Sequence, residues 1–410
     1  MSTAEPPTPI ERAERLWRTA WGHPWPHRFR KVISIQDIFP DGDVPISTDD
    51  SDDDESRIPN EFKYTCLHGM KSVFEACGGS ATPVQDVLVI RPEYVWLRET
   101  MQHGYLADAD SIVITGQPGI GKTVFLLYLL LYRLERKLPT AIHLYGDAFV
   151  MFNNKGAEIG SARAQGTSIT EDYWALTDSN AKLAQPCNAF ITSDARVIQA
   201  SPPKPDRWKA WCKHRSGKVV VSDLPRPLEI GAIVKELGLQ TNEVYPLVSK
   251  WGPCIRSILS VLKPKVARKS SEEGRKSSEE DRESDARMAR MSEEDARLRA
   301  KTARMSAEAD LSRAAEDAAK AILAMPSAFL SPLQARTPDD VWSALLFVSP
   351  DRQRLPGTDL VFDSGGAFTH IPTPYLTEVF NAGRSTNNKL CSSFAGSLRM
   401  LSCNHSQPWT

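Results

Sequence analysis

One short segment of the chain has the residue types and spacing of a phosphate-binding loop. It fits the pattern G-x-x-x-x-G-K-[ST] and consists of Gly116, Gln117, Pro118, Gly119, Ile120, Gly121, Lys122 and Thr123. Glycines let successive backbone N–H groups turn toward a phosphate, and a helix that begins at the loop adds the positive end of its dipole. Lys122 supplies a positive charge for the outer phosphates, and the Thr123 hydroxyl is a ligand that suits Mg²⁺. The segment therefore predicts a site for a nucleotide phosphate chain with Mg²⁺.

The residues on either side of this segment have the pattern that a phosphate site needs. Residues 111–115 are rich in β-branched side chains, and residues 123–137 have an apolar pattern of helical period without Gly or Pro. Strand, loop and helix in this order place the loop at the amino end of the helix. An ordinary glycine-rich turn with an exposed Lys122 is the alternative, and the flanking pattern argues against it.

A carboxylate on the metal side is expected at the carboxyl end of a neighbouring strand. Four strand-like runs end in an aspartate, at Asp147, Asp178, Asp194 and Asp223. We favour Asp178 because the apolar run before it suits an interior strand beside the strand of the loop. The other three aspartates suit helix caps or turns. Asp178 would then hold the Mg²⁺-bound water together with Thr123.

The residue after Asp178 bears on whether a bound nucleotide is hydrolysed. It is Ser179, whereas many ATP-hydrolysing proteins with this loop place a glutamate there to orient the attacking water. Either another residue polarises the water or turnover is slow. Glu171 and Asp172 are nearby acids in the sequence that could contribute.

Apolar runs typical of strands alternate with helical patterns through the middle of the chain. The runs lie at residues 87–90, 111–115, 141–145, 149–152, 173–177, 189–192 and 218–221. Near-continuous apolar strands separated by helices predict an α/β fold with a mainly parallel sheet flanked by helices. The turn signal Asn153-Asn154-Lys155-Gly156 predicts an additional hairpin over residues 149–159. A helical pattern at residues 227–262 predicts a small helical subdomain after the sheet.

Composition divides the chain into five parts. Residues 1–60 form an N-terminal segment whose acidic block at residues 49–55 predicts a solvated, disordered linker. Residues 61–226 form the α/β core, and residues 227–264 form a helical lid. Residues 265–320 form a charged insertion, and residues 321–410 form a small C-terminal α+β region.

The charged insertion has 14 Lys or Arg and 14 Asp or Glu residues. Met291, Leu298 and Met305 fall seven residues apart, as one position of a coiled-coil repeat would. The companion position is mostly Asp, Ala or Arg, whereas a sustained coiled coil needs both positions apolar. We therefore prefer a solvated helix with ion pairs between residues four apart, or partial disorder.

Composition also limits the function classes. The 410 residues carry 50 basic and 51 acidic side chains, so the chain lacks the overall basic character of a dedicated nucleic-acid binder. Trp208 and Trp211 lie among basic residues and could stack bases, but buried indoles are the favoured interpretation. No apolar run approaches the roughly 18 residues of a membrane span, and the first residues do not resemble a secretory signal.

The seven cysteines are scattered and contain no CxxC pair, which predicts free thiols in a reducing compartment. An intracellular location, cytoplasmic or nuclear, follows as an expectation. Cys66 and His68 lie too close on one expected strand to form a nucleophile and base pair.

Taken in order, these motifs resemble the P-loop NTPase module of Crinkler-type and retrotransposon-hot-spot proteins, which are grouped near the AAA and STAND branches. The resemblance covers about residues 86–262, and only the phosphate-binding motif is specific by itself. The other matching segments are VLVIRPEYVWLRETMQ with Arg91, Tyr94 and Trp96, then YWALTDSN, AFITSDAR, RWKAWCK and WGPCIRSIL.

The resemblance implies roles for further residues. AFITSDAR would be a strand carrying a polar sensor of the γ-phosphate, Thr192 or Ser193, and Arg256 in WGPCIRSIL would be a second sensor on the helical lid. Trp251 departs from the family, which usually has glycine there, and this puts the tightness of the turn before Arg256 in doubt. Family members often carry a nuclease-like domain after the NTPase, and residues 321–410 contain no convincing Asp followed by Glu-x-Lys.

The leading hypothesis is an ATP-binding P-loop NTPase with slow Mg²⁺-dependent hydrolysis coupled to a conformational switch. Lys122, Asp178, Ser193 and Arg256 would be its catalytic residues. The alternative is a nucleotide-gated interaction module that binds ATP without turnover and uses the acidic and charged segments to bind a protein partner. A small-molecule kinase is a third possibility, and the helical segment after the sheet argues against it.

Overall fold

The computed structural model describes residues 6–40, 59–79, 85–165, 169–180, 182–263, 282–324, 340–354 and 361–386. The acidic block at residues 49–55 and the first part of the charged insertion lie outside these ranges. Two of the seven cysteines, Cys391 and Cys403, also lie outside them. The five described cysteines are buried and free, as the sequence predicts.

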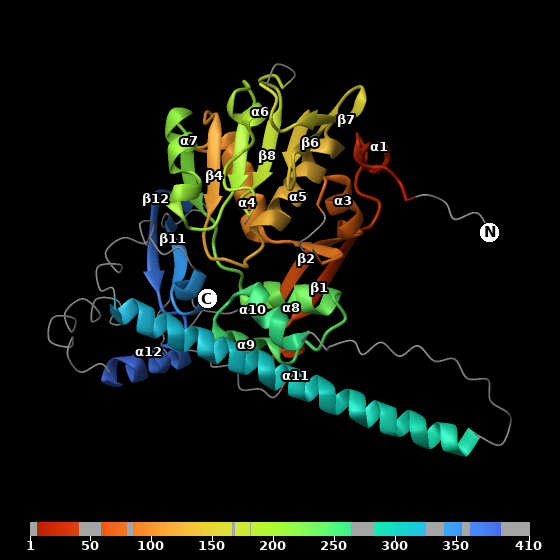
Figure 1. Ribbon diagram of the computed structural model, residues 1–410, viewed down its shortest axis with the longest axis vertical. Coiled ribbons are helices and arrows are strands. Elements are labelled where there is room, and N and C mark those ends of the chain that lie inside the picture. The colour runs from red at the N-terminus through yellow and green to blue at the C-terminus, as the bar shows by residue number, and fades with distance from the viewer. Residues whose placement is uncertain are drawn as a thin grey trace.

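A seven-stranded sheet forms the centre of the molecule (Figure 1), with the strand order β10-β4-β9-β8-β5-β6-β7. The first five of these strands are parallel, and β6 and β7 add an antiparallel hairpin. The α/β class is therefore confirmed. The strands are β4 (Ser111–Thr115), β5 (Thr140–His143), β6 (Ala148–Asn153), β7 (Gly156–Ser161), β8 (Trp174–Asp178), β9 (Arg196–Ala200) and β10 (Lys218–Val221).

Helices cover both faces of this sheet, which explains why its strands are apolar on both sides. Ile112 and Ile114 of β4 face the core that contains the apolar side of α5, whereas Val113 between them faces the opposite core. The first face packs against α4 (Pro92–His103) and α5 (Lys122–Glu135), and the second against α6 (Asn188–Ile191), η2 (Pro205–Arg207) and α7 (Lys209–His214).

Trp208 and Trp211 lie in the second core. Both indoles are less than a tenth exposed, and Trp211 Nε1 donates a hydrogen bond to Gln199 Oε1 at 2.9 Å. This burial agrees with the favoured interpretation and leaves neither indole available to stack on a base.

The hairpin predicted over residues 149–159 is present, but one predicted strand is wrong. The Lys155 N–H donates to Asn153 Oδ1 at 2.8 Å, which stabilises the turn between β6 and β7. Residues 189–192 belong largely to the short helix α6 rather than to a strand. The strand at this point of the sheet is β9, which begins four residues later.

The N-terminal segment is part of the folded body. Helix α1 (Pro9–Ala20) begins with a capping box between Thr8 and Glu11 and packs against α3 (Met70–Ala76), α5 and β7. A second, antiparallel sheet has the order β1-β2-β3 and consists of β1 (Arg28–Ser34), β2 (Glu61–His68) and β3 (Val87–Ile90). The boundary expected at residue 60 therefore falls between two paired strands. The short helix α2 (Ile35–Ile38) follows β1.

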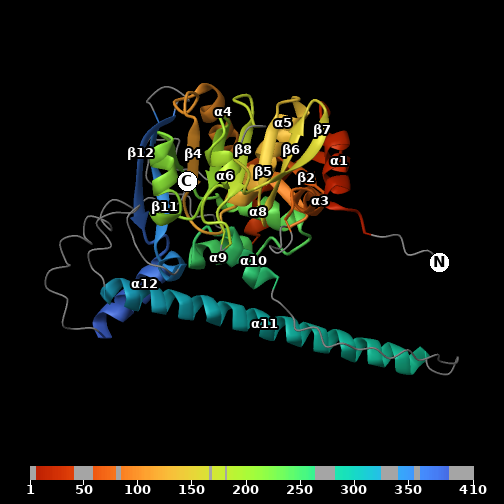
Figure 2. The same cartoon turned by 45° about the horizontal axis from the view of Figure 1, so that its top comes forward.

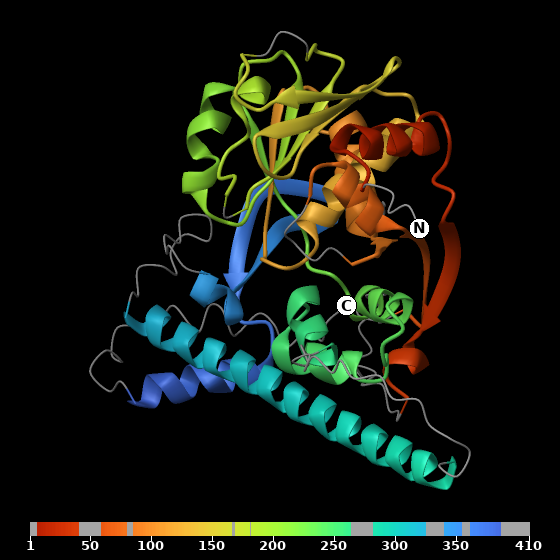
Figure 3. The same cartoon turned by 45° about the vertical axis from the view of Figure 1, so that its right-hand side comes forward.

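A helical group follows the main sheet, as predicted. It consists of α8 (Pro227–Glu236), α9 (Val244–Trp251) and α10 (Ile255–Leu262). Their apolar faces share a core with one face of the β1-β2-β3 sheet. Figure 3 shows this group below the main sheet.

The described part of the insertion is one long helix, α11 (Arg282–Ala324). Its 43 residues correspond to about 65 Å. Only its C-terminal part packs on the body, where Ala315, Ala319 and Ile322 are buried beside α12 (Pro374–Thr386) and η5 (Asp340–Ala344), and the rest projects away (Figures 1 and 2). The boundary expected at residue 320 thus falls inside this helix.

The C-terminal region also contains the hairpin of β11 (Phe347–Arg354) and β12 (Val361–His370), which contacts β10 at the edge of the main sheet. This mixture of helix and hairpin matches the expected α+β region. Among the described residues, no helix combines the length and apolarity needed to cross a membrane.

Candidate functional site

The glycine loop (residues 116–123) leaves the carboxyl end of β4 and runs into α5. Gly116 and Gly119 have φ angles of 126° and 86°, which glycine adopts without strain. A Cβ on Gly116 would lie 2.8 Å from the carbonyl oxygen of Ser222, and a Cβ on Gly119 would lie 2.7 Å from the Cβ of Arg256. Both positions therefore exclude larger residues, because the backbone of Ser222 and the side chain of Arg256 lie directly against the loop.

Lys122, the first residue of α5, turns its side chain back to the loop. Its Nζ donates hydrogen bonds to the carbonyl oxygens of Gly116 and Gln117, each at 2.8 Å. The ammonium group therefore lies beside the loop backbone. The amino end of α5 adds N–H groups that its own helix does not pair and the positive end of the helix dipole. Loop, ammonium and helix end together favour an anion.

Thr123 and Asp178 are brought together from different elements. Thr123 Oγ1 donates a hydrogen bond to Asp178 Oδ1 at 3.0 Å. Asp178 ends β8, as expected, but β8 is not next to β4 because β9 lies between them. The contact forms because α5 carries Thr123 over the carboxyl ends of the strands. The two residues that the sequence assigned to the metal are therefore adjacent.

The pair formed by Thr123 and Asp178 fits a Mg²⁺ ion. Mg²⁺ binds oxygen at 2.0–2.1 Å in an octahedron, so two ligands at neighbouring corners lie about 2.9 Å apart. Burial raises the pKa of Asp178 above its ordinary value, and the hydrogen bond from Thr123 and the charge of Lys122 oppose that rise. The negative charge of the Asp178 carboxylate is thus only partly balanced by its surroundings, and a bound cation would supply the missing positive charge.

Ser193 does not lie where the resemblance implies. It precedes β9, and its Oγ donates a hydrogen bond to the carbonyl oxygen of Phe190 at 2.9 Å. The glycine loop is at the carboxyl end of the parallel strands, whereas Ser193 is at the amino end, roughly five residues or about 16 Å away along the strand. The assignment of Ser193, or its neighbour Thr192, as a phosphate sensor is therefore wrong. The cause is that residues 189–192 are expected to be the strand, whereas they belong largely to α6 and the strand begins at Arg196.

Ser201 directly follows β9. It therefore lies at the carboxyl ends of the parallel strands, where a sensor of the γ-phosphate is expected. Its N–H donates to the carbonyl oxygen of Ile114 at 2.9 Å, which holds it beside the end of β4. The hydroxyls of Thr115, Thr177 and Ser201 are all buried and have no hydrogen-bond partner among the residues that the structure describes. Buried hydroxyls are normally paired, so these three groups have unused hydrogen-bonding capacity near the carboxyl ends of the strands. Recognising residues 196–200 as the strand would have found Ser201.

Arg256 lies against the glycine loop, as the resemblance implies. Its backbone N–H donates to the carbonyl oxygen of Gly119 at 3.3 Å, and Cys254 Sγ donates to that of Pro118 at 3.3 Å. The Arg256 side chain is exposed and makes no ion pair among the described residues. The amino end of α10 is instead attached directly to the loop.

The turn before α10 is tight despite Trp251. Gly252 has a φ of 79° and ends α9, so it supplies the required conformation alone. Trp251 is buried and its ring meets Tyr375 of α12 edge-on, with ring centres 5.1 Å apart. Trp251 thus provides a contact with the C-terminal region.

Arg207 was not singled out by the sequence. Its Nη1 donates to the carbonyl oxygen of Asn180 at 2.6 Å and to Ser179 Oγ at 3.3 Å. Ser179 Oγ in turn donates to the carbonyl oxygen of Ala184 at 2.9 Å. The residue after Asp178 is therefore engaged in positioning the loop after β8. The Arg207 guanidinium also lies close enough to Asp178 for its positive charge to act on that carboxylate.

The other acids considered lie away from this centre. Glu171 and Asp172 precede β8 and are therefore at its amino end, opposite the glycine loop. Asp147 forms an exposed ion pair with Arg163 at 3.0 Å. Asp223 Oδ1 accepts the N–H of Leu224 at 2.8 Å, which is a turn role.

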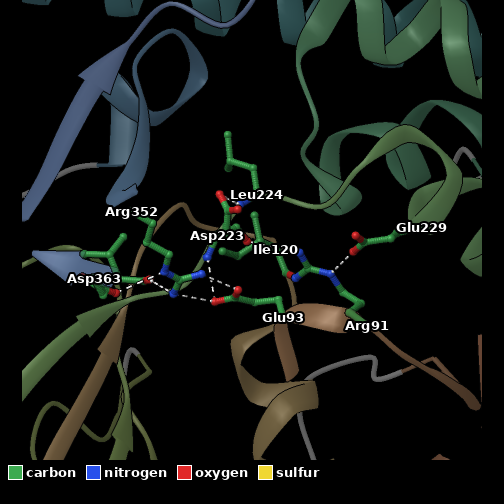
Figure 4. Close-up of polar contacts among 9 residues, drawn as sticks. Arg91, Glu93, Ile120, Asp223, Leu224, Glu229, Arg352 and Asp363 are labelled. Atoms are coloured by element: carbon green, nitrogen blue, oxygen red, sulfur yellow. Dashed lines mark hydrogen bonds and ion pairs between the residues drawn. The ribbon is translucent and has the colours of Figure 1, made fainter. Parts of the chain in front are cut away.

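Buried charges surround the glycine loop and fix its position (Figure 4). Arg91 is only 1% exposed, and its Nε donates to Glu229 Oε2 at 2.6 Å. Its Nη1 and Nη2 donate to the carbonyl oxygens of Ile120 and Asp223, each at 3.1 Å. Arg91 therefore joins the small sheet of β1, β2 and β3 to the loop and to helix α8. Tyr94 OH supports the same loop by donating to the carbonyl oxygen of Gly121 at 2.9 Å.

Arg352 forms the second half of this network and comes from β11. Its guanidinium donates to both oxygens of Glu93, at 2.6 and 3.1 Å, and to Asp363 Oδ2 at 3.1 Å. A further bond at 2.9 Å reaches the carbonyl oxygen of Val221 at the end of β10. Burial raises the pKa of Glu93, and Arg352 opposes that rise. The C-terminal hairpin is thus anchored to α4 by a buried ion pair (Figure 4) and to the edge of the main sheet by a hydrogen bond.

Gln117 connects the glycine loop itself to the C-terminal region. Its side chain is 1% exposed. Its Nε2 donates to the carbonyl oxygen of Ser343 at 2.7 Å, and its Oε1 accepts the N–H of Val348 at 3.3 Å. Any movement of the loop backbone at Gln117 therefore reaches η5 and β11 directly.

No protein-family model matches the chain, and no curated protein matches it either.

Replacing Asp178 by asparagine should stabilise the nucleotide-free protein at neutral pH. Because burial raises the pKa of Asp178, ionisation costs stability as pH rises from the ordinary aspartate value through the raised value. Asp178→Asn removes that cost and keeps an oxygen to accept the hydrogen bond from Thr123. Thermal unfolding should therefore show a higher transition temperature for Asp178→Asn at pH 7, with a difference that shrinks toward acid.

Asp147→Asn is the matched control, because Asp147 and its partner Arg163 are both largely exposed. It should show no such pH-dependent difference. A loss of stability of Asp178→Asn at every pH would contradict the electrostatic account.

Replacing Arg352 by methionine should destabilise the protein by about 3 kcal/mol, because it leaves Glu93 and Asp363 buried without their cation. Methionine keeps an apolar side chain beside Trp96, whose ring centre lies 3.5 Å from the Arg352 guanidinium carbon. Urea unfolding would measure the loss. Arg313→Met on α11 is the control, since its pair with Asp310 is exposed and should contribute less than about 1 kcal/mol. Equal losses in the two variants would show that the ion pair to Glu93 is unimportant.

Proposed function

We propose that the protein is an ATP-binding P-loop NTPase that hydrolyses ATP slowly with Mg²⁺ and couples the nucleotide state to a conformational change. The arrangement of β4, glycine loop and α5, with Lys122 on the loop carbonyls and Thr123 on Asp178, is the observation that carries this proposal. It assembles, within one edge of a parallel sheet, an anion site and a pair of hard oxygen ligands.

Each group has a definite task in this proposal. The N–H groups of the glycine loop and Lys122 bind the β- and γ-phosphates, and Thr123 and Asp178 are the residues that would hold Mg²⁺. The metal neutralises phosphate charge when it is bound. Ser201 takes the place of Ser193 as the candidate sensor, because its unpaired hydroxyl lies between β4 and β8. Adenine is preferred over guanine on the resemblance and on the absence of an Asn/Thr-Lys-x-Asp sequence.

Arg256 and Gln117 would transmit the nucleotide state. Arg256 stands on α10 beside Gly119 with an exposed guanidinium, so a γ-phosphate in the loop would give it an anionic partner that is lost on hydrolysis. Gln117 joins the same loop to the C-terminal region. A change in the loop would therefore bias the helical group on one side and the β11-β12 hairpin on the other.

A lysine variant tests nucleotide binding. Lys122→Ala should weaken ATP binding by about tenfold or more, at least about 1.4 kcal/mol, because a charge-assisted contact to phosphate is lost. Calorimetric titration of ATP into the full-length protein would measure the change. Lys155→Ala, in the exposed β6-β7 turn, should leave the affinity unchanged. ATP affinity that is the same in Lys122→Ala and the parent protein would refute the proposal.

A second candidate function is a nucleotide-gated interaction module that binds ATP without turnover. It is favoured by Ser179 at the usual glutamate position, since Ser179 holds the loop after β8 and has no carboxylate to orient water. In this case ATP would act as a ligand that sets the position of α10 and the C-terminal region. The long helix α11 would present a surface to a protein partner.

Phosphate release under multiple turnover separates the two functions. We expect slow release that requires Mg²⁺ and is abolished in Asp178→Asn, because the metal-binding carboxylate is lost. Asp147→Asn should retain the parent rate. A stoichiometric ATP complex that releases no phosphate would instead support the interaction module.

A further inference from the structure

A cysteine, a histidine and a glutamate meet on the small sheet, away from the glycine loop. Cys66 and His68 are two residues apart on β2 and therefore point to the same face of that sheet. Glu236 is the last residue of α8, which packs on this face. Their ligand atoms all lie within 4.8 Å of one another, and no other group of three such residues occurs in the part of the chain that the structure describes.

The separations of these atoms match those around a tetrahedral zinc ion. Bond lengths of about 2.3 Å to sulfur and about 2.0–2.1 Å to nitrogen and oxygen imply separations of about 3.6 Å for S–N, about 3.5 Å for S–O and about 3.3 Å for N–O. The observed distances are 3.7 Å from Cys66 Sγ to His68 Nε2, 3.4 Å from Cys66 Sγ to Glu236 Oε2, and 3.0 Å from His68 Nε2 to Glu236 Oε2. The three atoms thus already define one face of a zinc coordination tetrahedron.

We propose that Cys66, His68 and Glu236 form a binding site for Zn²⁺, with water as the fourth ligand. Thiolate, imidazole and carboxylate are the ligand types that zinc prefers, and a set of three protein ligands leaves one position open. Binding requires the thiolate, so the thiol proton of Cys66 is released to solvent when the metal enters. This site is independent of the proposed nucleotide function.

The surroundings of Glu236 suit a site that can take up and release the ion. Tyr64 OH donates to the other carboxylate oxygen, Oε1, at 2.8 Å, and so orients Oε2 toward the cysteine and histidine. Lys31 Nζ donates to Oε2 at 2.8 Å and is the cation that a metal would displace. The Lys31 and His68 side chains are 43% and 38% exposed, whereas Glu236 is 2% exposed. Lys31 can therefore swing into solvent, and the ion can enter on that side.

Zinc at this point would join β2 to the end of α8. Without metal, hydrogen bonds from Lys31, Tyr64, His68 and Cys66 to Glu236 already make this connection, but those of Lys31 and His68 involve partly exposed side chains. Coordination would replace these hydrogen bonds by metal–ligand bonds, which would hold β2 and α8 together when thermal motion breaks hydrogen bonds. The joined elements belong to the core that also contains α10. We therefore expect metal binding to stabilise the helical group against the sheet.

Titration of the full-length protein with Co²⁺ tests the site directly, since cobalt reports zinc coordination through its absorption spectrum. We expect one equivalent of Co²⁺ to give a thiolate-to-cobalt band together with the visible bands of a tetrahedral ion, and Zn²⁺ to abolish both. Cys66→Ser should lose the thiolate band. His68→Ala and Glu236→Gln should weaken binding by about tenfold or more, in the range that altered metal sites show. Cys77→Ser, at another buried and free cysteine, should behave as the parent.

Lys31→Ala provides a test that does not depend on removing a ligand. This substitution removes the competing cation from Glu236 and should therefore tighten Co²⁺ binding. If the three residues formed only a hydrogen-bond network, the substitution would remove one hydrogen bond and would not increase the affinity for Co²⁺. Circular dichroism would establish that each variant is folded. The proposal is overturned if no tetrahedral cobalt spectrum forms, if the thiolate band survives in Cys66→Ser, or if Lys31→Ala leaves the affinity unchanged or weaker.

Discussion

The need to pair buried charges determines how this molecule is assembled. Arg91 and Glu229 are almost completely enclosed, and a buried guanidinium without a carboxylate would cost several kcal/mol. Arg91 satisfies its other donors on the backbone of Ile120 and Asp223. The glycine loop, the end of β10 and helix α8 must therefore come together around one side chain. The precise shape of the loop follows from this arrangement rather than from its glycines alone.

The same constraint links the candidate site to regions far from it in sequence. Gln117 connects the loop to the C-terminal region, and Arg352 attaches that region to α4 through Glu93 and to β10 through Val221. The helical group is attached at Gly119 through the amino end of α10. Two positions of the loop that lie two residues apart, Gln117 and Gly119, thus contact two different parts of the molecule. The loop, the helical group and the C-terminal region are therefore connected by ordinary hydrogen bonds.

The sequence was informative where a pattern is local and failed where position depends on tertiary contacts. The α/β class, the β6-β7 hairpin and the helical group were predicted, because apolar periodicity and turn residues specify them. Residues 189–192 are too short an apolar run to distinguish a strand from a helix, and β9 contains the polar but buried Gln199, whose partner is Trp211. The role of Arg352 could not be predicted, since its partner Glu93 lies 259 residues earlier and no local pattern marks either residue.

That long separation has a consequence for how the chain folds as it is synthesised. The α/β core is complete in sequence by residue 221, yet Glu93 of α4 then still lacks the guanidinium that pairs with it in the complete structure. Until β11 emerges from the ribosome, the nascent core must keep this carboxyl protonated or leave the edge at β10 open to water. A hairpin made late therefore completes the edge of a sheet made much earlier, and a chain interrupted before residue 352 would expose an unfinished edge to chaperones and proteases.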